Sequence, residues 1–344
     1  MDSGKTITQE DVAQRAGVSR SIVSYVINNG PRKVSDDTRN RVLEAIRDLG
    51  YRPNKHAQML SGSDALVAEK SLGIILASDH MFKRPYYGSL LASMHEYVHE
   101  SGCHIRFIRL FEDFCNPALL NELIHPDEIG GLILVGLDQV QETDEDRDLI
   151  RDIVRRVDRA VCVEWEWPGV PSVQFDRQKA AAQATQHLLD NGRTRIAYIG
   201  PDDGRLAGYH QTLRNAGLDV GEGYAPFGVD VHLGYERCEQ ILQAGLPLDA
   251  ICAGTDEVAV GVLSCLHRHG LRVPEDIAVA SIDNLDLAAY TIPTLTSVDV
   301  PKIEIGFHAV DILLSDRPRG GASAFAITLP TQLVVRESSG GRTG

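Results

Sequence analysis

The sequence of 344 residues contains no hydrophobic run that approaches the roughly 20 residues needed to cross a bilayer. Its first ten residues also lack the apolar segment that a signal peptide requires. We therefore predict a cytoplasmic protein with no membrane partner. Hydrophobic residues make up 43% of the chain and charged residues 24%, which is typical of a globular protein that folds along its whole length.

Metal and redox motifs are also missing from the cysteine pattern. The six cysteines are scattered and lack the short paired spacings of a zinc site or a redox dithiol, so we predict buried free thiols. His267 and His269 are two residues apart, and such residues lie on different faces of a helix. The sequence therefore predicts no metal site and no cofactor.

Several motifs of the common enzyme classes have no counterpart in this chain. It contains no Gly-x-Gly-x-x-Gly fingerprint, no P-loop and no Gly-x-Ser-x-Gly elbow. These absences remove the usual routes to dinucleotide binding, nucleotide hydrolysis and acyl transfer. We therefore predict that the protein is not an enzyme and has no catalytic residues.

Charge is distributed unevenly along the chain, although its net value is −14. Residues 1–62 carry ten basic and seven acidic side chains, a balance of +3, and the rest carries 24 basic and 41 acidic ones, a balance of −17. A basic head on an acidic body places the attraction to phosphate at one end. The length also exceeds that of one compact core, so we expect a small head and a larger body.

Three short helices are predicted in the head. A capping box that begins at Thr8 starts the first helix, and Gly17 ends it with left-handed backbone. Ser19 can cap a second helix that reaches about Asn28, and a third starts at Ser35. Three short helices joined through one tight glycine turn suit the major groove of DNA.

The head also carries a long ordered pattern of residue types. It comprises residues 10–19, 23–28, 34–39, 50–54 and 57–60. In these segments the chain resembles the LacI/GalR family of repressors. The resemblance implies a transcription regulator with a helix-turn-helix head, which binds a pseudo-palindromic operator as a homodimer and responds to a small-molecule effector.

The resemblance further implies which residues contact DNA. The helix after Ser19 enters the major groove, and Arg20, Ser21 and Tyr25 stand at the positions that read bases. Ile22 departs from the threonine that the family has there. The expected DNA-binding residues are Thr8, Ser19, Arg20, Ser21, Ser24, Tyr25, Asn28, Asn54, Ala57 and Leu60.

A hinge is predicted over residues 54–64, where Asn54 can cap a short segment. In similar proteins this segment folds when two subunits meet on the operator, and the residue at the position of Leu60 enters the minor groove and bends the duplex. The expected domains are a DNA-binding head over 1–53, this hinge, a body over 71–337 and a loose tail over 338–344.

In the body, short apolar runs alternate with helical patterns, as in parallel βαβ units. The expected strands are 72–77, 105–110, 132–135, 161–163, 196–199, 250–253 and 277–281. Helices are expected between them, including 180–189 and 258–269. We predict an α/β fold in which a two-lobed, periplasmic-binding-protein-like body of doubly wound parallel sheets holds its ligand between the lobes.

The resemblance continues through the body at residues 205–209, 254–256, 280–284 and 293–296. It implies that the ligand is bound by Tyr86, Tyr87, Glu164, Arg205, Thr255 and Asp283. Carboxylates, an arginine and an aromatic ring suit a sugar, because hydroxyls need both donors and acceptors and a CH face stacks on a ring. Thr255 stands where the family usually has asparagine.

Other functions remain open from the sequence alone. The chain could be a purine- or nucleoside-responsive repressor, or a ligand-independent regulator with a vestigial cleft. A secreted or periplasmic sugar-binding protein would share the body, but the head and the missing signal peptide oppose it. Under the main hypothesis the ligand closes the lobes and changes the spacing of the hinges, as inducer or as co-repressor.

Overall fold

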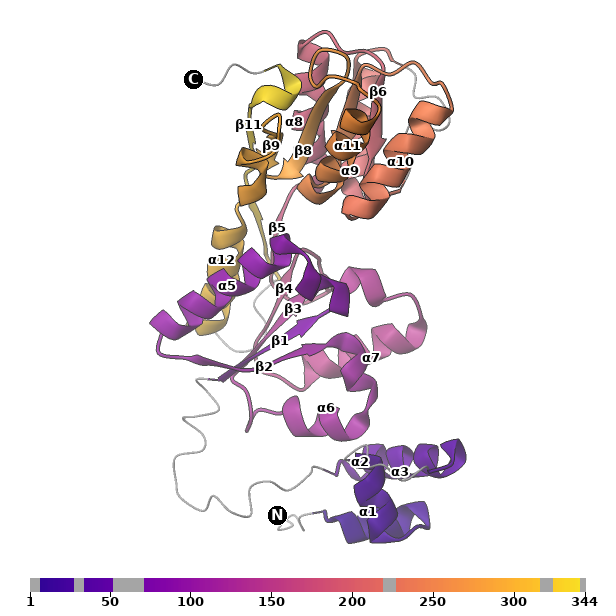
Figure 1. Cartoon of the computed structure of the whole chain (residues 1–344). Helices are drawn as coiled ribbons and strands as arrows, with labels where there is room; N and C mark the ends of the chain where they lie inside the picture. The colour runs from indigo at the N-terminus through magenta and orange to yellow at the C-terminus, as the bar shows by residue number, and fades with distance from the viewer. Residues whose placement is uncertain (1–6, 28–33, 52–70, 219–226, 316–323, 341–344) are drawn as a thin grey trace. The chain divides into compact units, whose positions relative to one another are not determined.

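The computed structural model describes residues 7–27, 34–51, 71–218, 227–315 and 324–340 (Figure 1). The chain divides into two compact units. Unit 1 comprises Met1–Val173 and Ile305–Ile327, and unit 2 comprises Gln174–Glu304 and Thr328–Gly344. The chain therefore passes from one unit to the other three times.

The head consists of the three predicted helices. They are α1 (Gln9–Ala16), α2 (Arg20–Ile27) and α3 (Asp36–Leu49). The capping box at Thr8 is confirmed, because its side chain accepts from the N–H of Asp11 and the Asp11 carboxylate accepts from the N–H of Thr8. Gly17 has φ +65°, which is the left-handed backbone that a glycine adopts without strain. Val12, Val23 and Val42 have no exposed surface and join the three helices in one core.

Unit 1 is built on a six-stranded sheet with the order β10-β5-β4-β3-β1-β2. Its strands are β1 (Ser71–Leu76), β2 (His104–Leu110), β3 (Gly131–Val135), β4 (Ala160–Val163), β5 (Ser172–Phe175) and β10 (Ala326–Leu329). The pairs from β2 to β5 are parallel. The helices are α5 (Pro85–Glu100), α6 (Pro117–Leu123), α7 (Asp144–Arg155) and α12 (Lys302–Leu314), which begins in unit 2. Figure 1 shows α5 and α12 on one side of this sheet and α6 and α7 on the other.

Unit 2 is built on a five-stranded sheet with the order β11-β9-β8-β7-β6. Its strands are β6 (Ile196–Ile199), β7 (Ala250–Ala253), β8 (Ala278–Asp283), β9 (Thr296–Asp299) and β11 (Gln332–Val334). All pairs are parallel except β11 with β9. The helices are α8 (Arg177–Asp190), α9 (Gly204–Asn215), α10 (Val231–Gln243) and α11 (Asp256–Arg268). The predicted α/β fold with parallel sheets is confirmed in both units.

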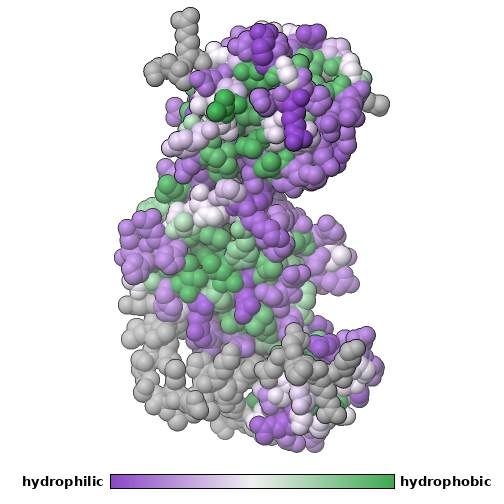
Figure 2. All heavy atoms as spheres, in the orientation of Figure 1, coloured by the Kyte–Doolittle hydropathy of each residue, from purple (hydrophilic) through white to green (hydrophobic). Residues whose placement is uncertain are grey.

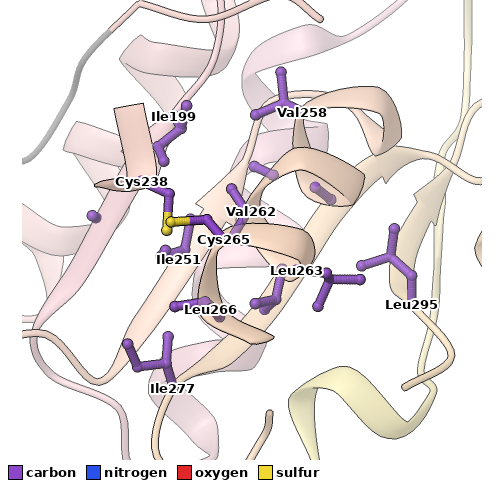
Figure 3. Close-up of a cluster of buried hydrophobic side chains, with 14 of the residues drawn as sticks. Ile199, Cys238, Ile251, Val258, Val262, Leu263, Cys265, Leu266, Ile277 and Leu295 are labelled. Atoms are coloured by element: carbon purple, nitrogen blue, oxygen red, sulfur yellow. The ribbon is translucent and has the colours of Figure 1, made fainter. Parts of the chain in front are cut away.

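The core of unit 2 lies between its sheet and the packed helices α10 and α11 (Figure 3). The thiols of Cys238 and Cys265 point toward each other in this core, and burial raises the pKa of both. Buried free thiols were predicted for all six cysteines. That prediction is wrong for Cys103, which is half-buried, and for Cys115, which is exposed.

The end of the chain differs from the predicted loose tail over 338–344. Ser338 and Ser339 are buried, with exposed fractions of 0% and 2%. The Ser338 hydroxyl donates to the carbonyl of Val279 and accepts from the N–H of Thr296. These residues therefore belong to unit 2, because they hydrogen-bond to β8 and β9, and the tail was predicted to begin too early.

No helix in the described parts of the chain is both long and apolar enough to cross a membrane.

Candidate functional site

Helix α2 presents a polar face to solvent. Arg20 and Ser21 are exposed, Ser24 and Tyr25 are half-buried, and Val23 is fully buried on the opposite side. This alternation gives the helix one stripe for the head core and one that can face a partner. The structure thus places the predicted base-reading side chains on a single surface.

Other predicted DNA contacts differ in their surroundings. The Thr8 hydroxyl is engaged in the capping box, where it donates to the Asp11 carboxylate over 2.6 Å. The Arg20 guanidinium donates to the side-chain oxygen of Gln9 over 3.4 Å, which links α2 to the start of α1. Ser19 is exposed in the turn before α2. The remaining predicted contacts, Asn28, Asn54, Ala57 and Leu60, lie outside the described residues.

In unit 1, three predicted ligand residues gather at the carboxyl end of β4. Glu164 directly follows that strand, and its Oε1 accepts from the hydroxyl of Tyr86 over 3.0 Å. The ring of Tyr86 meets the ring of Tyr87 edge-on at 5.2 Å, and Gln139 donates to the Tyr87 hydroxyl. The three predicted residues are buried, with at most 6% of their surface exposed. The fold therefore joins a carboxylate to two aromatic rings from α5.

In unit 2, Arg205 lies at the start of α9, after the carboxyl end of β6. Its Nε donates to both carboxylate oxygens of Asp203, over 3.1 and 3.2 Å, and its Nη2 donates to Oδ2 over 2.7 Å. Its Nη1 donates to the carbonyl of Gly254 over 3.1 Å. Gly254 must be a glycine here, because a Cβ would lie 2.7 Å from both Pro201 and the Tyr198 hydroxyl. The position of Arg205 is thus fixed by Asp203, which follows β6, and by Gly254, which follows the neighbouring strand β7.

The pKa of this ion pair reflects that arrangement. Burial opposes the charge on Arg205, but attraction to Asp203 and their hydrogen bonds outweigh it and raise the pKa of the guanidinium. Burial likewise opposes the charge on Asp203, but Arg205 holds the pKa of this carboxyl below its usual value. Both groups are therefore charged at neutral pH. The sequence predicted Arg205 as a ligand-binding residue but did not predict a role for Asp203.

Asp283 ends β8 at the same edge of this sheet and is 2% exposed. Its carboxyl adds to the raised pKa of the Arg205 guanidinium. Thr255 caps α11, and its hydroxyl oxygen accepts from the N–H of Val258 over 3.2 Å. Asp203, Arg205, Thr255 and Asp283 thus follow or end neighbouring parallel strands of unit 2. The edge where such strands end is the usual ligand-binding edge of these sheets.

Comparison with known proteins decides the family. Residues 8–54 match the bacterial regulatory proteins of the lacI family, and residues 185–339 match a periplasmic binding protein-like domain. The ribose operon repressor of Escherichia coli strain K12 is 31% identical over 318 residues, which cover 89% of this chain and 92% of the relative. The chain belongs to the LacI family. It is therefore a DNA-binding transcription regulator, as the sequence predicted.

Solved structures of LacI-family proteins agree with this assignment. A lac repressor dimer bound to operator and the anti-inducer ONPF has a TM-score of 0.67 and 26% identity, and the match covers 97% of this chain and 99% of that one. The transcriptional regulator CelR in a complex with cellobiose has a TM-score of 0.66 and 28% identity, with coverage of 96% and 99%.

One further acidic residue of this LacI-family chain was missed by sequence reasoning. Asp256 is completely buried at the first turn of α11. Its carboxylate accepts from the hydroxyls of Ser281 and Ser297 over 2.5 and 2.6 Å and from the N–H of Leu285 over 2.6 Å. It thereby ties the first turn of α11 to β8, β9 and the turn after Asp283, at the edge of the sheet where the predicted ligand residues of unit 2 lie.

A His-Glu-x-x-His pattern on α5 was also overlooked in the sequence. It comprises His95, Glu96 and His99, whose side chains are exposed. In zinc enzymes such a helix needs a third ligand from elsewhere in the fold. Within the described ranges, no group of three His, Cys, Asp or Glu side chains is placed to hold a metal ion. The pattern therefore lacks the surroundings that a zinc site requires.

Proposed function

We propose that this LacI-family chain is a cytoplasmic homodimeric repressor, without catalytic activity, whose affinity for a pseudo-palindromic operator is set by a sugar. The ribose operon repressor and the cellobiose-bound CelR support a sugar as the ligand class. The arrangement of strand-end groups in each unit supports the same class, because carboxylates accept from hydroxyls and a guanidinium donates to them.

Backbone geometry at the strand ends carries this proposal. Among the described residues, the non-glycine residues with positive φ are Glu164 at 69°, Asp283 at 114° and Asn284 at 48°. Such backbone costs on the order of 1–3 kcal/mol for each residue and is concentrated at functional sites. Two of the three were selected independently as ligand-binding carboxylates.

A thermal-shift screen tests the sugar assignment. The purified full chain is heated with sugars, sugar phosphates, nucleosides and purines, because a ligand bound to the folded state raises the melting temperature. We expect a rise with at least one uncharged sugar. A rise with purines or nucleosides alone would replace the sugar by that class, and no rise in the panel would favour a ligand-independent regulator.

Replacing Arg20 with alanine is expected to weaken operator binding about 5- to 150-fold, because a side chain paired with a base edge contributes roughly 1–3 kcal/mol. The operator is obtained first by selection from random duplexes with the full chain. Fluorescence anisotropy then measures affinity for the operator and its single-base variants. Arg47→Ala, on the exposed side of α3, is the control. Equal losses for all base variants in Arg20→Ala would show that Arg20 contacts only phosphate.

Two exposed hydrophobic residues support the homodimer. Hydrophobic residues lie among hydrophilic ones on the face shown in Figure 2. The most exposed large ones among the described residues are Tyr290 and Ile292, at 84% and 95%, in one loop of unit 2. Two large apolar side chains that are this exposed and only two residues apart are candidates for an association surface. We propose that this loop contacts the second subunit.

Ile292→Asp is therefore expected to raise the dimer dissociation constant at least about 100-fold, because a buried unpaired charge costs roughly 3 kcal/mol or more. Sedimentation velocity over a concentration series measures this. Val231→Asp places the same charge at another exposed apolar position of unit 2, at the start of α10, and should stay dimeric. An unchanged dimer in Ile292→Asp would remove this loop from the interface.

A further inference from the structure

Asp203 occupies one side of the Arg205 guanidinium. Three of the five N–H groups of Arg205 donate to protein acceptors in the described structure: the one on Nε and one on Nη2 to Asp203, and one on Nη1 to Gly254. One N–H on each terminal nitrogen is left for a ligand. The arginine therefore meets a ligand with its orientation already set and its charge already paired.

Arg205 and Asp203 are largely shielded from water, so the charge of each strongly affects the other and any ligand beside them. The side chain of Arg205 is 12% exposed and that of Asp203 is 27% exposed. Asp203 also caps α9 by accepting from the N–H of Arg205 over 2.9 Å, which fixes the carboxylate independently of the guanidinium. A second cation, Arg177, reaches Asp203 only at 3.9 Å. The main partner of the carboxylate is thus Arg205.

We propose that Asp203 is a specificity-determining residue that makes the Arg205 site select uncharged hydroxyl compounds and reject phosphorylated or carboxylated ones. This inference rests on the proposed function, because it names the class of sugar that the same site accepts.

Electrostatics explains the selection. An unpaired buried arginine attracts phosphate and carboxylate strongly through charge-assisted, bidentate hydrogen bonds. Here an anion that reached the two remaining N–H groups would approach the carboxylate of Asp203, whose oxygens lie 2.7, 3.1 and 3.2 Å from Nη2 and Nε of the same guanidinium. The anion and the Asp203 carboxylate, held by the same guanidinium, would repel each other, and burial leaves this repulsion poorly screened. A neutral hydroxyl oxygen accepts from the same N–H groups without this repulsion.

The test is a titration with inorganic phosphate, which probes the charge on Arg205 without a sugar. Asp203→Asn removes the negative charge, and an asparagine keeps the helix cap. Asp202→Asn removes the same charge from the preceding, exposed residue and is the matched control. We expect Asp203→Asn to bind phosphate about 10- to 100-fold more tightly than wild type. Its melting temperature should rise by roughly 3 °C in phosphate at ten times Kd, relative to chloride at equal ionic strength.

Wild type and Asp202→Asn should show no such rise. Equal phosphate affinity in wild type and Asp203→Asn would overturn the proposal, and so would an equal gain in Asp202→Asn. If Asp203→Asn does not fold, the proposal is tested on wild type alone. Phosphate binding as tight as that of the sugar found by thermal shift, and lost in Arg205→Gln, would overturn it, whereas weaker or no phosphate binding supports it. The sugar proposal fails by a different result, the absence of any sugar-induced shift in wild type.

Discussion

Replacing Arg205 with alanine is expected to abolish the response of operator binding to ligand, while affinity for operator without ligand stays within about threefold of wild type. The substitution removes the two N–H groups of Arg205 that remain for the ligand. Each hydrogen bond from such a charged group contributes about 1.5–3 kcal/mol to binding. The ligand affinity should therefore fall by at least about 100-fold. The head keeps its own core and its polar α2 face, so DNA recognition is retained.

The measurement is an anisotropy titration of labelled operator, with and without the sugar found by thermal shift. Arg195→Ala is the matched control, because Arg195 lies at the opposite end of β6 and pairs with Asp249 over 3.2 Å. That variant should respond like wild type. A full ligand response in Arg205→Ala would remove this residue from the site, whereas loss of operator binding without ligand would show that the substitution damages the fold.

The second large effect is expected at Asp256. Asp256→Ala removes the buried acceptor of the Leu285 N–H and of the Ser297 hydroxyl, and it leaves the Ser281 hydroxyl only its 3.2 Å bond to the Thr296 carbonyl. Each buried polar group left unsatisfied costs about 1–3 kcal/mol, so we expect a loss of roughly 3–5 kcal/mol in the free energy of unfolding. Chemical denaturation followed by circular dichroism measures it. Asp286→Ala, an exposed acid just after this turn, should change stability by less than about 0.5 kcal/mol.

The same carboxyl gives a pH dependence with a defined sign. Burial raises the pKa of Asp256 above its usual value, although the three hydrogen bonds and Lys302 act against this. The folded state then binds the proton more tightly than the unfolded state. The stability this provides is fully present below the unfolded pKa and is lost as pH rises through the folded pKa.

Asp256→Asn isolates the contribution of this carboxyl to stability, because asparagine does not titrate. The stability of wild type relative to Asp256→Asn should increase as the pH is lowered from 7 toward 4. Denaturation of both proteins across this range measures the difference, to which titrating groups that do not interact with Asp256 contribute nothing. A difference that is flat, or that grows with rising pH, would contradict the assignment.

Local signals explain why much of the fold was predictable. The capping box at Thr8 and the turn at Gly17 act within a few residues, and the structure places α1 where they predicted it. Strands β6 and β7 are continuous apolar runs and were predicted with their correct bounds. In contrast, β5 and β9 contain four residues each and about half of them are polar, so they give no such signal. Their place depends on neighbouring strands.

The site was predictable only in part, for the same reason. The resemblance selected Arg205 and Asp283 because they lie within contiguous motifs. Asp256 lies in such a motif too, but its role depends on hydroxyls 25 and 41 residues away, which only the parallel sheet brings to it. Asp203 is two residues from its partner, yet the sequence does not show that its carboxylate turns back to the guanidinium. The role of Asp203 could therefore be recognised only from the three-dimensional structure.

Under the proposed function, a sugar that binds the body controls DNA binding by the head. The most direct test of this control is the dissociation constant of the wild-type chain for its selected operator, measured with and without each of a series of uncharged sugars. We predict that at least one sugar changes this constant by about tenfold, since coupling between sites is commonly 1–3 kcal/mol. Tight operator binding that no sugar alters would contradict the account and identify a regulator that does not respond to sugars.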